Sequence, residues 1–476
     1  MVHAFRIHGL NIAFDNNVNA LHILDDLSFA LLEAHINSGA GAFAGAWPAE
    51  GAALKYGPDE ILEASRELSA LVESGQLLTP DLEEPNNPAT PDLEEPKNPA
   101  TPEYALKSLC MHMAHDCNMR CAYCFASDGG YGQKRELMSF ETAKAAIDFV
   151  AGASGARKNI EIDFFGGEPL LNFDVIKRVV EYARSIETAK GKRFRFTLTT
   201  NGLLLDDKTA DYVNENMDNL VLSIDGRKET HDGLRRRPGG AGTYGAVVEN
   251  FLSATRKRSK SWYARGTFTA RNMDFTKDAL HLADIGLDRI SLEPVVSPAD
   301  PALDFEPGAQ KIIEAEYEKL AYDMFVRESG GHENGGRPFA FFHFDVDLDS
   351  GPCLARRIKG CGAGYEYAAV TPDGSLYPCH QFAGERRFRI GDVYGGVDAP
   401  ETVRSFINTS IYTKDECRVC WAKYFCGGGC AANAWHYNKD IARPNPFYCA
   451  LFKKRIECAL WLKCAAAQPG PDGPVS

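Results

Sequence analysis

Six apolar, strand-like runs alternate with amphipathic helical runs between Leu106 and Val295, in the order LKSLCMHM, NIEIDFF, FRFTLT, LVLSI, ARGTFTA and RISLEPV. This alternation limits the fold more than any other feature of the sequence, because a strand that is followed by a helix returns most readily to a parallel strand of the same sheet. Six such units predict an α/β fold built on a partial (β/α)6, TIM-like barrel. The number of strands alone leaves a doubly wound sheet as the alternative.

The 476-residue chain exceeds what one hydrophobic core usually serves, so we expect further domains around the barrel. Residues 1–78 open with two stretches of alternating apolar residues, followed by two helical segments, which predicts a small winged-helix-like module. Residues 79–103 contain the repeat TPDLEEPNNPA and TPDLEEPKNPA, whose prolines and acidic residues predict an extended linker. We assign the barrel to 104–340 and a Gly- and Cys-rich, metal-organised domain to 341–476, where YAAVTPDGSLYPC predicts a hairpin.

The formal net charge of −13 argues against a nucleic-acid partner, because affinity for phosphates depends on clustered Lys and Arg. The start of the chain lacks the basic residues and the unbroken apolar run of a signal peptide, and no run of about 18 apolar residues predicts a membrane span. We therefore expect a cytoplasmic protein without a membrane partner. In a reducing compartment 14 cysteines are rarely a disulfide framework, so they indicate bound metal.

Three cysteines, Cys117, Cys121 and Cys124, follow the first predicted barrel strand with the spacing C-x3-C-x2-C. Three thiolates can hold three irons of a 4Fe-4S cluster and leave the fourth iron open to another ligand. They close a zinc site only with a fourth ligand, for which His112 or His115 is available, and buried free thiols are a further alternative. The surrounding motifs favour the cluster.

Polar, glycine-containing motifs follow the next three predicted strands: GGEP at Gly166–Pro169, TTNG at Thr199–Gly202 and SIDG at Ser223–Gly226. A parallel barrel collects the carboxyl ends of its strands at one face, so we expect these motifs to lie beside the cysteines. Glycine lets the backbone approach a ligand, and Glu168 can accept a hydrogen bond from an amino group. One such motif is usually only a turn, but the cysteines and three motifs in strand order predict a cofactor site.

These residues resemble the radical S-adenosylmethionine (SAM) enzymes, from the CNMRCAYC stretch with its aromatic Tyr123 to the three strand-end motifs. The resemblance implies that Cys117, Cys121 and Cys124 hold a 4Fe-4S cluster whose open iron binds SAM, and that an electron from the cluster cleaves SAM to a 5′-deoxyadenosyl radical. It also implies SAM contacts for Tyr123, Gly166, Gly167, Glu168, Thr200, Asn201, Ser223, Asp225 and Arg235.

A second set of cysteines is crowded into residues 417–430 with the spacing C-x2-C-x5-C-x3-C, for which two zinc sites are the alternative. The set resembles the SPASM extension of peptide-modifying radical SAM enzymes, whose cysteines hold two auxiliary 4Fe-4S clusters, giving three clusters in all. The resemblance implies Cys417, Cys420, Cys426 and Cys449 as ligands of one cluster, and Cys361, Cys379 and Cys430 as ligands of the other. Cys353 is a candidate fourth ligand of that second cluster, and without it one iron stays open to a substrate thiolate.

The chain as a whole resembles the maturases of SCIFF peptides (six cysteines in forty-five residues). The likeness rests on SLCMHMAHDCNMRCAYCFAS, DFFGGEPLLNFDV, VLSIDGRKETHD, FHFDVDLDSGPC and YPCHQF, behind an opening with GLNIAFD and LHILDD, and the tandem TPDLEEP repeat departs from it. It implies an enzyme that installs intramolecular thioethers, as in sactipeptides and ranthipeptides, in a small Cys-rich precursor. The N-terminal module resembles PqqD-like leader-recognition elements, which bind a peptide as an added strand. A short winged-helix or oligomerisation module is the alternative.

The implied chemistry is removal of a hydrogen atom from the precursor by the 5′-deoxyadenosyl radical, followed by bonding of a cysteine sulfur to that carbon. An auxiliary cluster would bind the thiol or accept the released electron, and a flavodoxin or ferredoxin would donate electrons. Other peptide oxidations on this scaffold, such as formylglycine formation in a sulfatase or carbon–carbon cross-linking, are alternatives, as is a non-catalytic, metal-stabilised peptide-binding protein. The sequence identifies no catalytic base. Cys110, Cys458 and Cys464 fit no ligand spacing and are expected to be buried side chains, and His380 is expected to serve packing.

Overall fold

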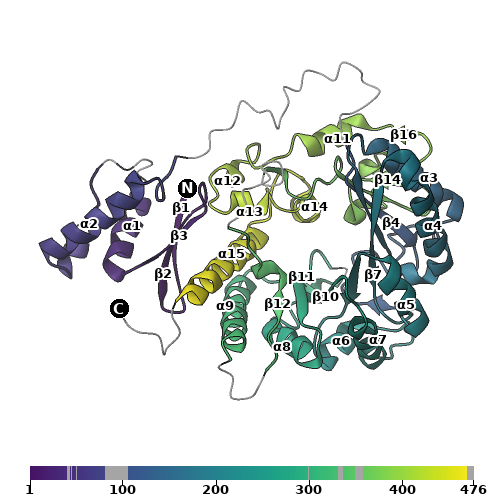
Figure 1. Cartoon of the computed structure of the whole chain (residues 1–476), viewed down its shortest axis with the longest axis horizontal. Coiled ribbons are helices and arrows are strands. Elements are labelled where there is room, and N and C mark those ends of the chain that lie inside the picture. The colour runs from purple at the N-terminus through teal and green to yellow at the C-terminus, as the bar shows by residue number, and fades with distance from the viewer. Residues whose placement is uncertain are drawn as a thin grey trace.

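The computed structural model describes residues 1–39, 43, 45–49, 51–80, 105–298, 300–330, 336–348 and 358–468. Nearly all of the predicted linker and the candidate ligand Cys353 lie outside the described residues. A small N-terminal module lies to one side of a larger body that contains the barrel, and the yellow C-terminal helix runs between them (Figure 1). None of the helices in the described ranges combines the length and the apolar character that a bilayer crossing requires.

The N-terminal module is a three-stranded antiparallel sheet covered on one face by helices. Its elements are β1 (Val2–Ile7), β2 (Leu10–Asp15), β3 (Ala20–Leu24), α1 (Asp26–Asn37), η1 (Ala52–Leu54) and α2 (Pro58–Glu73). The strand order is β1-β2-β3, which leaves β3 at an edge. Side chains alternate between the two faces, so Ala13 packs toward Leu31 and Leu68 of the helices, whereas Ile12 and Phe14 join the core of the larger body.

The six predicted barrel strands form one parallel sheet. They are β4 (Ser108–Ala114), β6 (Asn159–Gly166), β7 (Arg193–Thr200), β8 (Asn219–Ser223), β10 (Ser261–Phe268) and β11 (Arg289–Pro294). Neighbouring strands follow chain order, β4-β6-β7-β8-β10-β11, and every pair is parallel. A doubly wound sheet reverses its order at a switch point, so the uninterrupted order confirms the partial barrel.

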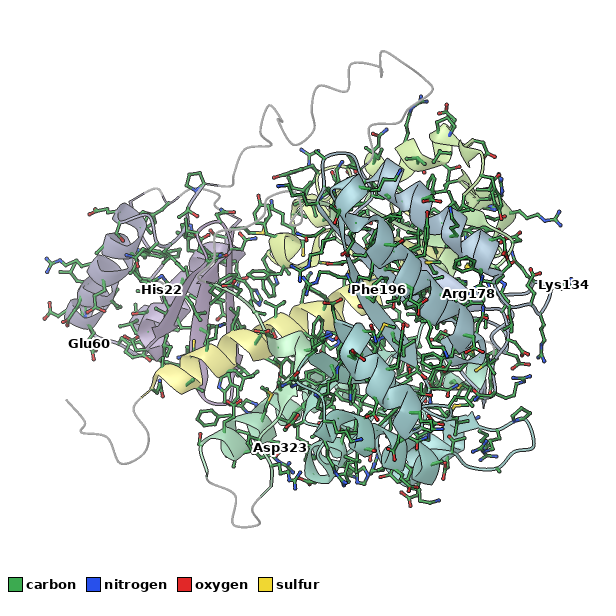
Figure 2. The ribbon with its side chains drawn as sticks, turned by 45° about the vertical axis from the view of Figure 1, so that its right-hand side comes forward. His22, Glu60, Lys134, Arg178, Phe196 and Asp323 are labelled. Carbon is green, nitrogen blue, oxygen red and sulfur yellow. The ribbon has the colours of Figure 1, made fainter. Side chains whose placement is uncertain are left out.

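Helices cover the outer face of these strands (Figures 1 and 2). They are α3 (Phe140–Ala153), η2 (Pro169–Asn172), α4 (Phe173–Lys190), α5 (Asp207–Asn216), α6 (Lys228–Leu234), α7 (Tyr244–Arg256), α8 (Phe275–Ile285), η3 (Pro301–Leu303) and α9 (Ala309–Glu328). Side-chain caps set their starts, since Ser139 and Asp206 accept from backbone amides of α3 and α5. Phe164 and Phe196, both fully buried, stack on each other in the core beneath the helices.

The cysteine-rich region continues the barrel sheet instead of forming a separate layer. Its elements are β12 (Ala340–Phe341), η4 (Phe342–Phe344), β13 (Tyr367–Val370), β14 (Ser375–Tyr377), η5 (His380–Phe382), η6 (Arg386–Phe388), β15 (Gly391–Asp392), β16 (Gly396–Val397), α11 (Pro400–Ile407), α12 (Asp415–Arg418), α13 (Lys423–Cys426), α14 (Ala431–Asn438) and α15 (Pro446–Ala467). β13 pairs in parallel with β4, and β14 to β16 extend the sheet. The antiparallel β13–β14 pair confirms the predicted hairpin.

Helix α15 connects the parts of the molecule. It packs along α9 and contacts β1 and β3 of the N-terminal module. The His3 ring stacks on Trp421 with 3.9 Å between ring centroids, and its Nε2 lies 2.8 Å from Glu457 Oε1 on α15. Cys458 and Cys464 on the same helix are buried, as is Cys110 on β4, which confirms the expectation for these three thiols.

Candidate functional site

One cavity of about 460 Å³ opens at the carboxyl ends of the barrel strands and is lined by both cysteine-containing regions. Cys117, Cys121 and Cys124, here called the cysteine loop, line it from the barrel. Cys426, Cys430 and Cys449 line it from the C-terminal region. Of the predicted SAM contacts, Tyr123, Gly166, Gly167, Glu168, Thr200, Asn201, Ser223 and Arg235 reach this cavity. Cys361, Cys379, Cys417 and Cys420 lie outside its lining.

The thiols of the cysteine loop are held in surroundings that favour a metal. Burial is the main cause that raises the pKa of the Cys117 thiol to about 12, and neighbouring Cys121 and Cys124 raise it further. A short strand pair, β5 (Arg120–Cys121) with β9 (Arg235–Arg236), places Cys121 opposite Arg235. A thiol with so high a pKa is protonated at neutral pH and is a poor nucleophile. Metal ligands must be deprotonated, so these thiols become thiolates only when a cation is bound. The donor set therefore fits an iron–sulfur cluster.

The glycines of GGEP are required by packing between two loops. The Gly167 amide donates to the Ala114 carbonyl at 2.8 Å, and the Glu168 amide donates to the Asp116 carbonyl at 2.9 Å. A Cβ on Gly166 or Gly167 would overlap the same carbonyl oxygens, and Gly166 has φ +123°. We predicted that these glycines let the backbone approach a ligand; in the structure they let GGEP pack against the start of the cysteine loop.

Glu168 is buried and almost fully hydrogen-bonded. Its carboxylate accepts from Thr200 Oγ1 at 2.8 Å, from the Asn201 amide at 2.8 Å and from the Leu170 amide at 3.1 Å. Burial outweighs these bonds and raises the pKa of Glu168 to about 7. A ligand amino group in the cavity would favour the ionised form, so the carboxylate is suited to orient one.

Asn201 joins the end of β7 to the cysteine loop. Its Nδ2 donates to Asn118 Oδ1 at 2.7 Å and lies 3.6 Å from Cys117 Sγ. The side chain therefore steadies the segment that carries the first cysteine. Ser223 lies at the end of the neighbouring strand β8 and faces the same cavity.

Tyr123, Asp225 and Arg235 form one network in the cavity wall. The Tyr123 hydroxyl lies 2.8 Å from both Asp225 oxygens, and Arg235 Nη1 donates to that hydroxyl at 2.7 Å. Asp225 also accepts from the Thr267 amide at 3.1 Å and does not line the cavity, so it is placed to orient Tyr123 rather than to touch a ligand. Arg235 Nε is buried and meets no hydrogen-bond acceptor among the residues that the structure describes, which fits an acceptor atom of a ligand.

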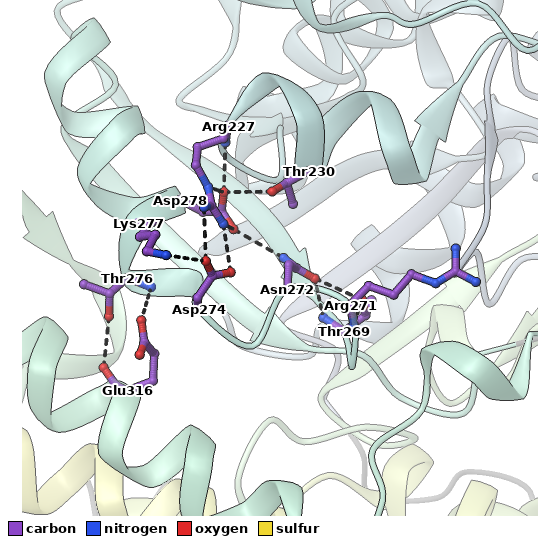
Figure 3. A network of polar contacts seen from close by, with 10 residues as sticks. All are labelled: Arg227, Thr230, Thr269, Arg271, Asn272, Asp274, Thr276, Lys277, Asp278 and Glu316. Carbon is purple, nitrogen blue, oxygen red and sulfur yellow. Dashed lines mark hydrogen bonds and ion pairs between the residues drawn. The ribbon is translucent and has the colours of Figure 1, made fainter.

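The SIDG loop is anchored by an ionic network on α8 (Figure 3). Fully buried Asp278 accepts from the Arg227 amide at 2.9 Å, from Arg227 Nε at 2.7 Å and from Thr230 Oγ1 at 3.1 Å. Arg227 also pairs with Asp274 at 2.8 Å, and a Cβ on Gly226 would overlap Asp278. This network fixes the position of Asp225. Nothing in the local sequence of α8 indicated that its acidic residues would hold the SIDG loop.

The C-terminal thiols fall into two groups by their mutual electrostatic effects. Burial raises the pKa of Cys417, Cys426 and Cys449, and neighbouring thiols of this first group, Cys420 included, raise it further. In the second group burial raises the pKa of Cys379 and Cys430, with further contributions from Cys430 and Cys361 to Cys379 and from Cys361 to Cys430. These are the two ligand sets that the SPASM resemblance implies. In the described part of the chain no group of three or more His, Cys, Asp or Glu side chains lies close enough together to hold one metal ion.

The cavity lining includes two charged residues that the sequence analysis did not identify, Glu293 and Arg455. Glu293 lies 3.0 Å from His343 Nε2 and 3.3 Å from Arg455 Nη2, and Arg455 Nε donates to the Tyr317 hydroxyl at 2.8 Å. Burial alone would raise the pKa of Glu293, but its interactions with His343 and Arg455 hold it well below its usual range. These residues come from β11, η4, α9 and α15, so no local motif could have indicated them.

His380 also lines the cavity, next to the candidate ligand Cys379. Its Nδ1 lies 3.2 Å from the Tyr367 hydroxyl, and its ring contacts Phe165 at 5.0 Å between ring centroids. Burial lowers the pKa of His380 to about 4, so the imidazole is neutral. Packing was expected for this residue, and the structure adds a position in the cavity wall.

Comparison with known proteins agrees with this geometry. Residues 111–283 match the model of the radical SAM superfamily. The chain is 25% identical over 377 residues to a cysteine-type anaerobic sulfatase-maturating enzyme of Clostridium novyi, an alignment that covers 74% of this chain and 95% of that protein.

Two solved structures share the fold. Native anSMEcpe with bound AdoMet and Cp18Cys peptide aligns with a TM-score of 0.60 at 21% identity, over 76% of this chain and 100% of that one. Streptococcus suis SuiB bound to S-adenosylmethionine aligns with a TM-score of 0.50 at 15% identity, over 92% and 96%. These two structures show that the fold is shared. The match of residues 111–283 to the family model, together with the cysteine loop and the strand-end motifs, shows that this central part of the chain is a radical SAM domain.

Proposed function

We propose that this chain is a peptide maturase that forms intramolecular thioethers in a small, Cys-rich precursor peptide. The observation that carries the proposal is the shared cavity, which is lined by the cysteine loop and by three of the C-terminal cysteines. A site for radical generation and a site for electron removal would then face the same bound peptide. Likeness of the whole sequence to the SCIFF maturases supports the thioether over other products.

The chain's own residues fit the two cofactors. Cys117, Cys121 and Cys124 would hold a 4Fe-4S cluster, and Glu168 and Arg235 offer an acceptor and a donor to SAM. Bound there, the cluster and SAM supply a 5′-deoxyadenosyl radical, which takes a hydrogen atom from the peptide. The protein contributes orientation through the hydrogen bonds around these side chains.

Thioether formation needs an electron acceptor, as the balance of the reaction shows. A cysteine S–H and a carbon C–H of the peptide become one C–S bond. One hydrogen leaves as an atom to the 5′-deoxyadenosyl radical, and the other leaves as a proton with one electron. We propose that two auxiliary 4Fe-4S clusters occupy the two C-terminal thiol groups and that one of them accepts this electron. A flavodoxin or ferredoxin would supply the separate electron that SAM cleavage consumes.

The N-terminal module offers a place for the precursor's leader. Among the described strands β3 is the edge strand of its sheet, and a groove of about 650 Å³ lies beside it, lined by Leu21, Ile23, Leu68 and Leu71 and by the end of α15. An extended peptide can add to such an edge through backbone hydrogen bonds while the apolar groove selects its side chains. We therefore propose that residues 1–78 bind the leader along β3.

Formylglycine formation is the competing function, because the Clostridium novyi relative carries the name of a sulfatase-maturating enzyme. The two reactions differ in what happens to sulfur. A thioether removes two hydrogens and consumes one free thiol but keeps the sulfur, whereas formylglycine formation from cysteine replaces sulfur by oxygen.

The deciding experiment incubates the reconstituted, reduced protein with SAM and a Cys-rich peptide and follows the peptide by mass spectrometry before and after thiol alkylation. Loss of two hydrogens together with loss of one alkylation site is the expected result. Sulfur loss from the peptide would favour formylglycine formation, and a peptide that keeps every alkylation site would refute the thioether.

A further inference from the structure

A buried lysine lies between the two groups of C-terminal cysteines. Lys414 is 4% exposed, and in the described part of the chain no carboxylate lies within ion-pair distance of its ammonium. Lysine is almost never this deeply buried without a partner, because taking its charge out of water is costly. Its only hydrogen-bond acceptor in that part of the chain is the Gly428 carbonyl, at 2.7 Å from Nζ. A single neutral acceptor does not offset the burial of a full charge.

The thiols supply the missing negative charge. Burial disfavours the charged form of Lys414 and lowers its pKa, whereas Cys417, Cys426, Cys430 and Cys449 lie close enough to favour that form. Three of them belong to the first group of thiols, and Cys430 belongs to the second. As neutral thiols they would do little, but as thiolates of bound clusters they would surround the ammonium with negative charge.

The loop that Lys414 contacts joins the two groups. Gly427, Gly428 and Gly429 lie between Cys426 and Cys430 and have φ values of 64°, 89° and 77°, a left-handed run that other residues rarely adopt. The ammonium holds the middle of this run, while the Lys414 carbonyl accepts from the Cys417 amide at 3.0 Å. Lys414 thus contacts the backbone of both cysteine-bearing segments.

We propose that Lys414 raises the reduction potential of the auxiliary cluster held by Cys417, Cys420, Cys426 and Cys449, and so prepares it to accept the electron released on C–S bond formation. The inference rests on the proposed function, which places clusters at these thiols. A reduced cluster carries one more negative charge than the oxidised one. A fixed positive charge in a dry site stabilises the reduced form more, and net charge is one of the factors that set cluster potentials. The electron balance is one electron from the peptide to the oxidised cluster, which then passes it to a ferredoxin- or flavodoxin-type carrier.

The test separates charge from hydrogen bonding. Lys414→Gln keeps a donor for the Gly428 carbonyl without the charge, and Lys414→Arg keeps both. Arg418→Met is the matched control, because it removes an exposed positive charge next to Cys417 that water already screens. All variants are made in a full-length Cys117→Ala, Cys121→Ala, Cys124→Ala background, which leaves only the auxiliary clusters.

Iron and sulfide content and an EPR-monitored redox titration are the measurements. We expect Lys414→Gln with full iron content to show at least a tenfold lower equilibrium constant for one-electron reduction, a shift of about 59 mV to more negative potential. Lys414→Arg and Arg418→Met should stay near the parent value. Loss of auxiliary iron in Lys414→Gln but not in Lys414→Arg would also support the role of the charge. An unchanged potential at full iron content, or equal iron loss in both Lys414 variants, would overturn it. A parent protein that binds no auxiliary iron would instead refute the proposed clusters.

Discussion

Glu168 provides a sharp test of the SAM site, through its pH dependence. Burial raises the pKa of this carboxyl from 4.5 to about 7, so in the absence of ligand it is half-protonated near neutral pH. SAM would bind the ionised form through its amino group. Lowering the pH from 8 to 6 should therefore weaken SAM binding about tenfold, because the carboxylate falls to roughly a tenth of the population at one pH unit below its pKa.

The pH dependence of folding stability has the opposite sign to that of SAM binding. A carboxyl whose pKa is raised on folding contributes stability below its unfolded pKa near 4.5 and loses it as the pH rises through about 7. The shift corresponds to about 3 kcal/mol that the SAM-free protein gives up by pH 8. Glu168→Gln should remove this pH-dependent loss, so in the absence of SAM the free energy of unfolding of the variant should change less between pH 5 and pH 8 than that of the wild type.

The decisive assay is the SAM dissociation constant, measured anaerobically by equilibrium dialysis between pH 6 and pH 8. Glu168→Gln should bind SAM about tenfold to a hundredfold more weakly at pH 8, because a hydrogen bond to a charged group becomes one to a neutral amide. It should also lose the pH slope that Glu168 causes. Glu161→Gln, at an exposed position on the preceding strand β6, is the control. Ionisable groups of SAM and of the cluster affect the pH profile of the dissociation constant equally in both proteins, so the difference between the two profiles reports on Glu168. Parallel profiles for wild type and Glu168→Gln would refute the reasoning.

Three further predictions test the supports of the site. Asp278→Asn should lower the free energy of unfolding by about 3 kcal/mol in denaturant unfolding, because it leaves the Arg227 guanidinium without its buried partner. A change below about 1 kcal/mol would show that the network does not stabilise the fold. Gly167→Ala should lower the total iron per chain by the content of one cluster, because its Cβ would push GGEP away from the cysteine loop. Retention of all iron would contradict this packing argument. Leu71→Glu should weaken binding of a leader peptide at least tenfold in fluorescence anisotropy, whereas the exposed Leu54→Glu should not, and equal effects would exclude the β3 groove.

The elements that the sequence predicted are those with a local signature. Each barrel strand carries an apolar run of the right length, and the cysteine loop follows β4 because its spacing is local. The turn residues of the predicted hairpin likewise place β13 and β14 next to each other. In all these cases the interacting residues lie within a few positions of one another in the chain.

The missed features depend on long-range contacts or on side-chain direction. Arg455 and Glu293 meet across 162 positions of the chain, and Lys414 stands in a polar stretch, TKDEC, that reads as exposed surface. The SIDG motif indicated Asp225 as a ligand contact, but a motif specifies a residue type and not its orientation. The structure turns that carboxylate toward Tyr123 and the Thr267 amide, behind the cavity wall.

The pairing of β13 with β4 explains how two cysteine regions far apart in the sequence come to share one cavity. β4 leads directly into the cysteine loop, and β13 continues through β14 to Cys379 and His380. Both chain segments start from one pair of hydrogen-bonded strands, so the distance between the two thiol regions is set by a rigid sheet and not by a flexible hinge. Helix α15 adds a second fixed point, because Arg455 ties it to Glu293 on β11 while Cys449 lies on its first turns. A peptide bound in this cavity would therefore meet the cysteine loop and the C-terminal thiols at fixed positions, which is what a reaction that creates a radical at one place and removes an electron at another requires.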